Sequence, residues 1–171
     1  MRVLIIFFVG MMFTLQSCEK DPVFESQICR PGNKPEITDT QNRNTPQLKG
    51  HWQLVNTQNF SNQVYLAYDS LTGRKPILKF LDEKQIRILG PINDCGNEYF
   101  TIGPQNGKNW LIFKNNPMPC TKVGGNLKWE EHYKKALLNS TCYNINQNQL
   151  IIQYFISKDK KGMLIYKKVK T

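Results

Sequence analysis

The feature that most constrains this chain is a repeated local pattern of short apolar runs, each closed by turn-forming residues. Within these runs apolar and polar residues mostly alternate, which places one face of an extended segment on a core and predicts β-strands. We expect strands at 51–56, 64–68, 76–81, 85–89, 98–102, 109–113, 141–145, 150–156 and 163–169. Most connections are short clusters rich in Gly, Pro, Asn and Asp, so the strands should pair with antiparallel neighbours.

One segment has a different period. Between Asn126 and Asn139 the apolar residues recur at helical spacing, at Trp129, Tyr133, Ala136 and Leu137. Two Glu–Lys pairs four residues apart support this helix, Glu130 with Lys134 and Glu131 with Lys135. The predicted fold is therefore β-rich α+β, a curled antiparallel sheet or incomplete barrel of about eight strands with one packed α-helix.

The N-terminus has the layout of an export signal. A charged start, Met1-Arg2, precedes the apolar run Val3–Leu15, whose 13 residues would rise about 20 Å as a helix. This is too short to span about 30 Å of hydrocarbon, and a short apolar run of this kind is typical of a secretory signal. Leu15-Gln16-Ser17-Cys18 resembles the bacterial lipobox. We expect residues 1–17 to be a cleaved lipoprotein signal peptide and Cys18 to carry the lipid, palmitate included; the alternative is a plain signal peptide with a coincidental cysteine.

The residues after Cys18 indicate a location and a tether. Lys20-Asp21 is similar to the surface-export signal of Bacteroidetes lipoproteins, so we expect a lipid-anchored protein of the outer membrane, with the periplasmic or surface-exposed side left open. Residues 18–47 are polar and hold few large apolar groups, and they form the lipidated N-terminus and a flexible tether. Residues 48–171 are long enough for one core and form the folded domain.

The remaining four cysteines are an even number in an oxidising compartment, which predicts two disulfides. Three connectivities are open. We favour Cys95–Cys120, because these residues lie on neighbouring predicted strands, and Cys29–Cys142 then follows and staples the tether to the domain. Metal ligation is the alternative, but the chain lacks a Cys-x-x-Cys motif or paired histidines, so we expect no metal.

The charge balance of the predicted domain bears on its partners. Residues 48–171 contain 18 Lys and Arg against 8 Asp and Glu. Export excludes cytosolic nucleic acid, and the lysine clusters lack the interleaved aromatics of a nucleic-acid groove. A basic surface outside the cytoplasm favours anionic lipid or an acidic polysaccharide; the alternative is a solvated lysine-rich surface without a specific partner.

Aromatic residues suggest a second kind of site. They either fill the core or line an apolar pocket for a lipid or another small ligand, and the candidate pocket residues are Trp52, Phe80, Tyr99 and Trp110. Asp69-Ser70-Leu71 resembles the Bacteroidetes O-glycosylation sequon.

Several short motifs together resemble one family, the META domain of the HslJ heat-shock protein. They are, in chain order, Gly50-His51-Trp52-Gln53-Leu54, Leu78-Lys79-Phe80, Cys95-Gly96-Asn97-Glu98-Tyr99, Met118-Pro119-Cys120, the helix residues Glu131, Tyr133 and Leu137, and Gln149-Leu150-Ile151-Ile152. Gly96 is an extra residue in the third motif, and the threonine that usually precedes Met-x-Cys is not in its place. The resemblance implies a small β-rich domain, often an envelope lipoprotein, without an established catalytic activity. The presence of both Cys95 and Cys120 supports their pairing.

Three functions follow, in order of preference. The first is a non-catalytic envelope lipoprotein that acts as an interaction or envelope stress and maintenance module, with an envelope protein as its partner. The second is a lipid- or small-ligand-binding protein. The third is an envelope hydrolase, for which His51 or His132 would have to pair with Cys120 or Asp94. The chain contains no nucleophile elbow, phosphate loop or metal motif, so we expect neither catalysis nor a cofactor.

Overall fold

The structure of the protein is a computed structural model. It describes residues 29, 47–59, 74–82, 84–105, 108–114, 118–121, 127–157 and 160–170. The predicted leader, the lipidated Cys18, almost all of the tether, the strand expected at 64–68 and the Asp69-Ser70-Leu71 sequon lie outside these ranges.

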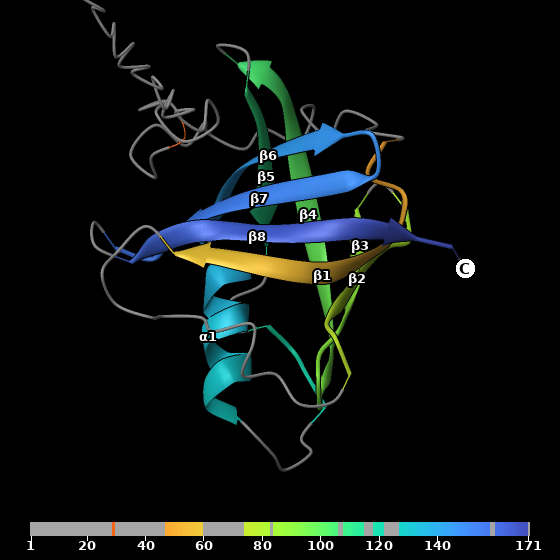
Figure 1. Cartoon of the computed structure of the whole chain (residues 1–171), viewed down its shortest axis with the longest axis vertical. Coiled ribbons are helices and arrows are strands. Elements are labelled where there is room, and N and C mark those ends of the chain that lie inside the picture. The colour runs from red at the N-terminus through yellow and green to blue at the C-terminus, as the bar shows by residue number, and fades with distance from the viewer. Residues whose placement is uncertain are drawn as a thin grey trace, which may run out of the picture.

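The described strands form a closed up-and-down barrel (Figure 1). Each strand pairs antiparallel with the next along the chain, and β8 pairs antiparallel with β1 to close the ring. The strands are β1 (Gly50–Asn59), β2 (Ile77–Phe80), β3 (Gln85–Leu89), β4 (Asp94–Gln105), β5 (Lys108–Phe113), β6 (Ser140–Asn146), β7 (Gln149–Phe155) and β8 (Lys161–Val169). The β-rich α+β class is confirmed. The sequence predicted a curled sheet or an incomplete barrel, and the structure is a closed barrel.

The largest difference from the predicted strands is in β4, which begins at Asp94 rather than at Glu98. Its first half pairs with β3 and its second half with β5, with a register irregularity between Ile102 and Gln105. Gly and Asn are weak strand formers, so the segment Cys95-Gly96-Asn97 did not indicate a strand. Pairing with β3 decides its conformation.

The strand alternation fills the interior of the barrel. Inward-facing side chains of all eight strands, together with the helix, form one core in which the largest fully buried residues include Trp52, Leu54, Leu78, Ile86, Leu111, Tyr154 and Tyr166. Each side chain of this size contributes about 1.5–3 kcal/mol when it is fully removed from water. The hydrophobic core is therefore inside the barrel, and the outer wall is left for other contacts.

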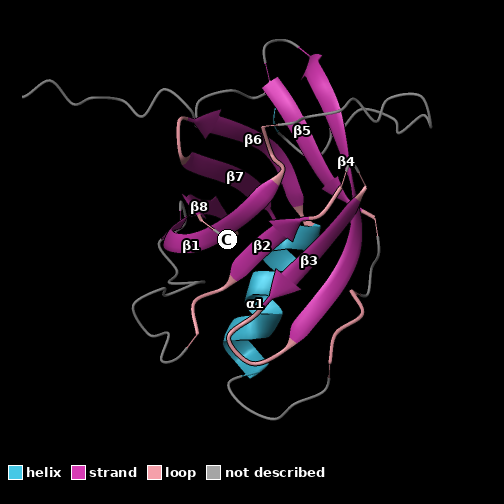
Figure 2. Ribbon diagram, turned by 90° about the vertical axis from the view of Figure 1, so that its right-hand side faces the viewer, coloured by secondary structure: helices cyan, strands magenta, loops and turns pink. Residues whose placement is uncertain are grey.

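The helix α1 (Leu127–Leu138) closes one end of this core; Figure 2 shows it behind β2 and β3. Trp129 and Tyr133 stack at 5.1 Å between ring centroids. The Tyr133 and Tyr166 hydroxyls share a buried hydrogen bond of 2.9 Å. Burial raises the pKa of both tyrosines above the ordinary value. The predicted helix is confirmed to within one residue at each end.

Both predicted disulfides are present. Cys95 and Cys120 join β4 to a short bridging segment, with 4.1 Å between their Cα atoms. Cys29 and Cys142 join the tether to β6, with 5.6 Å between Cα atoms. Around the second disulfide lies a smaller apolar cluster on the outer wall, made by Cys29, Ile102, Trp110, Ile112 and Cys142 with Phe155 packed against it.

Candidate functional site

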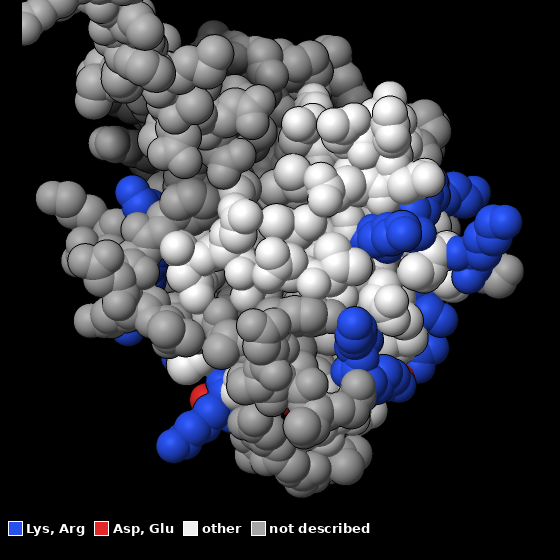
Figure 3. Space-filling model, viewed as in Figure 1, with Lys and Arg blue, Asp and Glu red and all other residues white. Residues whose placement is uncertain are grey.

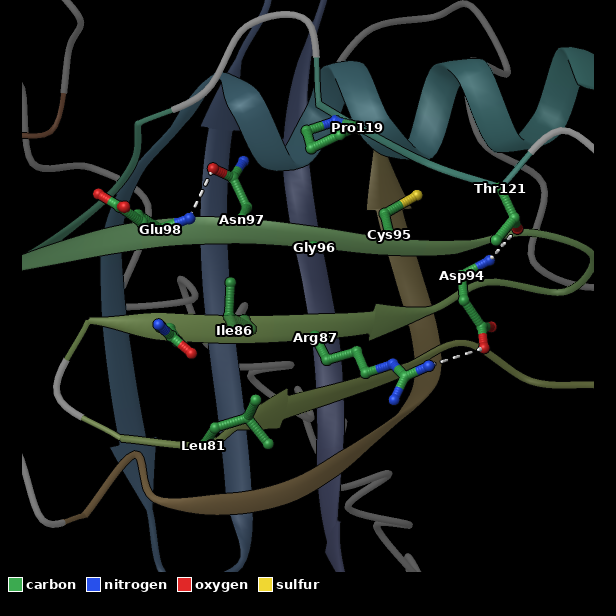
Figure 4. A pocket seen from close by; sticks show the side chains of 11 residues that line it. Leu81, Ile86, Arg87, Asp94, Cys95, Gly96, Asn97, Glu98, Pro119 and Thr121 are labelled. Carbon is green, nitrogen blue, oxygen red and sulfur yellow. Dashed lines mark hydrogen bonds and ion pairs between the residues drawn. The ribbon is translucent and has the colours of Figure 1, made fainter.

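An open groove of about 420 Å³ lies on the outer wall of the barrel over β3 and β4. Figure 4 shows that its lining residues come from β3, from β4, from Leu81 in the β2–β3 connection and from the segment Met118–Thr121. The lining residues are Leu81, Gln85, Ile86, Arg87, Asp94, Cys95, Gly96, Asn97, Glu98, Pro119 and Thr121. We call this feature the β3–β4 groove.

Strand alternation sets the floor of the groove. Ile86 and Ile88 are buried in the barrel, so Arg87 between them is exposed on the outer wall. Arg87 is the cross-strand partner of Gly96 on β4. A Cβ atom added to Gly96 would meet no heavy atom within 4 Å. The glycine therefore leaves open space beside the Arg87 guanidinium.

One wall of the groove is the segment Met118–Thr121, which pairs with the edge of β4 that β3 does not occupy. The Gly96 N–H donates to the Pro119 carbonyl (3.1 Å), and the Thr121 N–H donates to the Asp94 carbonyl (2.9 Å). The Cys95–Cys120 disulfide ties the same two segments covalently. The groove is thus held between a barrel strand and a fixed wall.

The charged groups in the groove are partly satisfied by one another. Asp94 accepts from the Arg74 guanidinium at 2.6 Å, and Arg87 lies 3.8 Å from the other carboxylate oxygen of Asp94. Glu98 pairs with Lys114 at 2.9 Å. The Arg87 side chain is 59% exposed. An exposed pair at that separation contributes little stability, so the Arg87 guanidinium is accessible to a ligand.

A buried hydrogen-bond network supports one end of the groove. The Asn93 N–H donates to Glu130 Oε1 (3.0 Å), and the Asn93 side-chain amide donates to Glu130 Oε2 (2.5 Å). The Asp94 N–H donates to the Thr121 hydroxyl (3.0 Å). Glu130 is 2% exposed. The expected pairing of Glu130 with Lys134 is therefore wrong, because the carboxylate turns inward and fixes the β3–β4 connection to α1.

The four candidate pocket aromatics do not come together. Trp52, Phe80 and Tyr99 belong to the barrel core, where the rings of Phe80 and Tyr99 pack edge to face with 4.9 Å between their centroids. Trp110 lies in the separate cluster on the outer wall, and its buried Nε1 has no hydrogen-bond partner among the residues that the structure describes. None of the four lines the β3–β4 groove.

The two histidines considered for catalysis lie on different elements of the fold. His51 lies on β1 beside Lys79 of β2; partial burial and then the charge of Lys79 lower the pKa of His51. His132 lies on α1. Cys120, which a thiol mechanism would need, is in a disulfide. Within the described ranges, no three His, Cys, Asp or Glu residues are placed to hold a metal ion.

A second hollow, of about 370 Å³, lies on the outer wall at the β6–β7 turn. It is lined by Val55, Asn146, Gln147, Asn148, Gln149 and Lys167. Gln147 adopts a left-handed φ of 51°, as a two-residue hairpin turn requires. Nothing in the sequence singled out this turn as a site, although four consecutive amide side chains were visible there. We call it the amide hollow.

Among the helical residues that the structure describes, none forms a helix long and apolar enough to cross a membrane.

The chain matches no protein-family model and no curated protein. In three dimensions it resembles the crystal structure of a DUF4847 family protein from Bacteroides vulgatus, with 13% sequence identity and a TM-score of 0.48. The superposition covers 72% of this chain and 94% of that chain. This likeness is too distant to support an inference about function.

Proposed function

We propose that the protein is a non-catalytic, lipid-anchored module of the bacterial outer membrane that binds another envelope component through the outer wall of its barrel. Its anchor is the lipid on Cys18, and its family is the META/HslJ-like lipoproteins that the sequence motifs resemble. The role is one of interaction or of envelope maintenance under stress.

The observation that carries this proposal is the position of the open space. The inward-facing aromatics of the described strands are packed in the barrel core, whereas both hollows described above lie on the outer wall. A protein that carries a small ligand needs a concave, largely enclosed site. An open groove with a fixed wall and an exposed arginine is better suited to a larger partner that covers it.

The two disulfides support an extracytoplasmic location for the folded domain, because disulfides persist in oxidising compartments. They also use the thiols that a cysteine hydrolase would need. Cys120 is in a disulfide and Asp94 pairs with Arg74, so the residues considered for hydrolysis give no reason to prefer it.

Site-specific photo-crosslinking in living cells tests the proposal. The photoreactive residue p-benzoylphenylalanine replaces Gly96, where an added side chain meets open space. The matched control carries it at Lys135, an exposed position on α1. We expect irradiation to give a discrete adduct from position 96, of protein or of glycan, and none or a much weaker one from position 135. If position 96 gives no adduct while the protein is exported and lipidated normally, the proposal fails.

A further inference from the structure

The two hollows on the outer wall are joined by a row of polar and basic residues. The strand registers pair Gln149 of β7 with Lys167 of β8, and Lys167 with Gln53 of β1. The row continues from His51, which lies two residues before Gln53 on β1 and pairs with Lys79 of β2. Lys79 pairs with Arg87 of β3, and Arg87 pairs with Gly96 of β4. We call this row the basic track; it is Gln149, Lys167, Gln53, His51, Lys79, Arg87 and Gly96.

All these side-chain positions are on the outer wall. Trp52, Leu78 and Ile86, which neighbour the track residues in sequence, are buried in the barrel, and successive residues of a strand point to opposite faces. The track crosses five strand-to-strand steps of about 4.8 Å, which gives about 24 Å around the wall, and it also shifts by about 7 Å along β1 between Gln53 and His51. It begins in the amide hollow, which includes Gln149 and Lys167, and ends in the β3–β4 groove, which includes Arg87 and Gly96.

The charge of the track is positive and little compensated. Within the described part of the chain, Lys79 and Lys167 have no ion-pair partner. Of the nearby carboxylates, Asp94 pairs with Arg74 at 2.6 Å and lies 3.8 Å from Arg87, and Glu98 pairs with Lys114. Figure 3 shows Lys and Arg side chains gathered on the side of the molecule where β8 ends, next to an uncharged face. A concentration of one sign of charge attracts the opposite sign from solution.

We propose that the basic track is the binding site for one strand of an acidic polysaccharide, with its sugar hydroxyls in the amide hollow and its acidic groups on Lys167, Lys79 and Arg87. This inference rests on the binding role proposed above and names the partner of the same outer wall. The track has the form of a line rather than a compact cluster, which fits an extended polymer. Asn and Gln amides both donate and accept hydrogen bonds, as recognition of hydroxyl groups requires.

Other anionic partners fit the same surface less well. Among the described residues, Leu81, at 49%, is the exposed large apolar side chain, whereas a surface that inserts into a bilayer presents several apolar side chains. The track residues include no Phe, Tyr or Trp, and their one aromatic ring is the imidazole of His51, so the track lacks the row of stacking rings of a site for single-stranded nucleic acid.

Binding is measured on the full lipidated chain, purified in a mild non-ionic detergent, with polygalacturonate as the probe and uncharged dextran as the control polymer. The track variant combines Lys79→Gln and Lys167→Gln. The matched control combines Lys128→Gln and Lys135→Gln, which removes the same charge from exposed positions on α1. At low ionic strength we expect the track variant to lose at least about tenfold in affinity and the control less than about threefold, and added salt to weaken binding of the unmodified chain. Equal melting temperatures show that both variants are folded.

Four results overturn the inference. The first is equal loss in the track and control variants, which would reflect net charge alone. The second is binding of dextran as tightly as polygalacturonate. The third is a preference for micelles doped with an anionic phospholipid without any binding of the polymer. The fourth is an adduct from position 96 without polygalacturonate binding, which would leave the proposed binding role standing and reject only the polysaccharide.

Discussion

Replacing Glu130 with alanine tests the network that holds the β3–β4 connection against α1. The substitution removes the two carboxylate oxygens that accept from the Asn93 N–H at 3.0 Å and from its side-chain amide at 2.5 Å. Asn93 is itself 3% exposed, so water does not readily replace the lost acceptors. Each buried donor left unsatisfied costs about 1–3 kcal/mol. Because the variant also no longer buries a carboxylate, we expect the free energy of unfolding to fall by about 2–4 kcal/mol.

Urea denaturation of the full chain in detergent, followed by tryptophan fluorescence, measures this change. The control is Glu131→Ala, one residue further along α1 and exposed, which should cost less than about 0.5 kcal/mol. The double variant Glu130→Ala with Asn93→Ala should cost less than the sum of the two single changes, because each partner is then removed with the other. If Glu130→Ala and Glu131→Ala have the same effect, the hydrogen bonds between Glu130 and Asn93 contribute nothing measurable to stability, and the proposed role of the network is refuted.

Three further outcomes follow from local geometry. Gly162→Ala should destabilise the barrel by about 1–3 kcal/mol, because the new Cβ would meet the Tyr154 hydroxyl at 2.5 Å and the Gln58 carbonyl. Gly96→Ala is the control and should change the urea midpoint little, because the space around Gly96 is open. Equal effects of the two substitutions would contradict this prediction. Gln147→Gly should raise the free energy of unfolding by about 0.5–1 kcal/mol, since Gln147 holds a φ of 51°; a lower urea midpoint would show that the turn is not strained. The raised pKa values of Tyr133 and Tyr166 mean that the folded state keeps protons that the unfolded state releases, so stability is complete below about pH 10 and falls above it. Replacing both tyrosines with phenylalanine should remove part of that alkaline loss in unfolding curves recorded as a function of pH, and an unchanged slope would reject the assignment.

Much of the fold could be predicted because the residues that face the core recur with the period of a strand or of a helix. Alternation in Gln85–Leu89 gave that strand its observed bounds, and the helical spacing of Trp129 and Tyr133 gave α1. Closure of the barrel could not be predicted, because it depends on the pairing of β1 with β8, which are at opposite ends of the domain. No local pattern reports such a pairing; it depends on the twist and register of all the strands between them.

The candidate site was harder to predict than the fold. The aromatic inventory did not say which wall of the barrel each ring would face, so Trp110, which lies on the outer wall, was grouped with Trp52, which lies inside. For Glu130 a signal was available. It precedes Tyr133 by three residues and Leu137 by seven, so it lies beside the apolar stripe of the helix rather than on the opposite face. Because Glu130 is charged, the sequence pattern predicts it on the solvent-exposed face of the helix, in a pair with Lys134.

The position of the basic track follows from the barrel core rather than from its own contacts. The side-chain period of a strand is two, so a one-residue slip of any strand would move its apolar residues out of the core. Burial of Trp52, Leu78 and Ile86 therefore fixes His51, Lys79 and Arg87 in one row on the outer wall. Substituting the charges should leave the row in place, since the core holds the register. For this reason charge-removing variants of the track can separate binding from folding, whereas variants of the supporting network at Glu130 cannot.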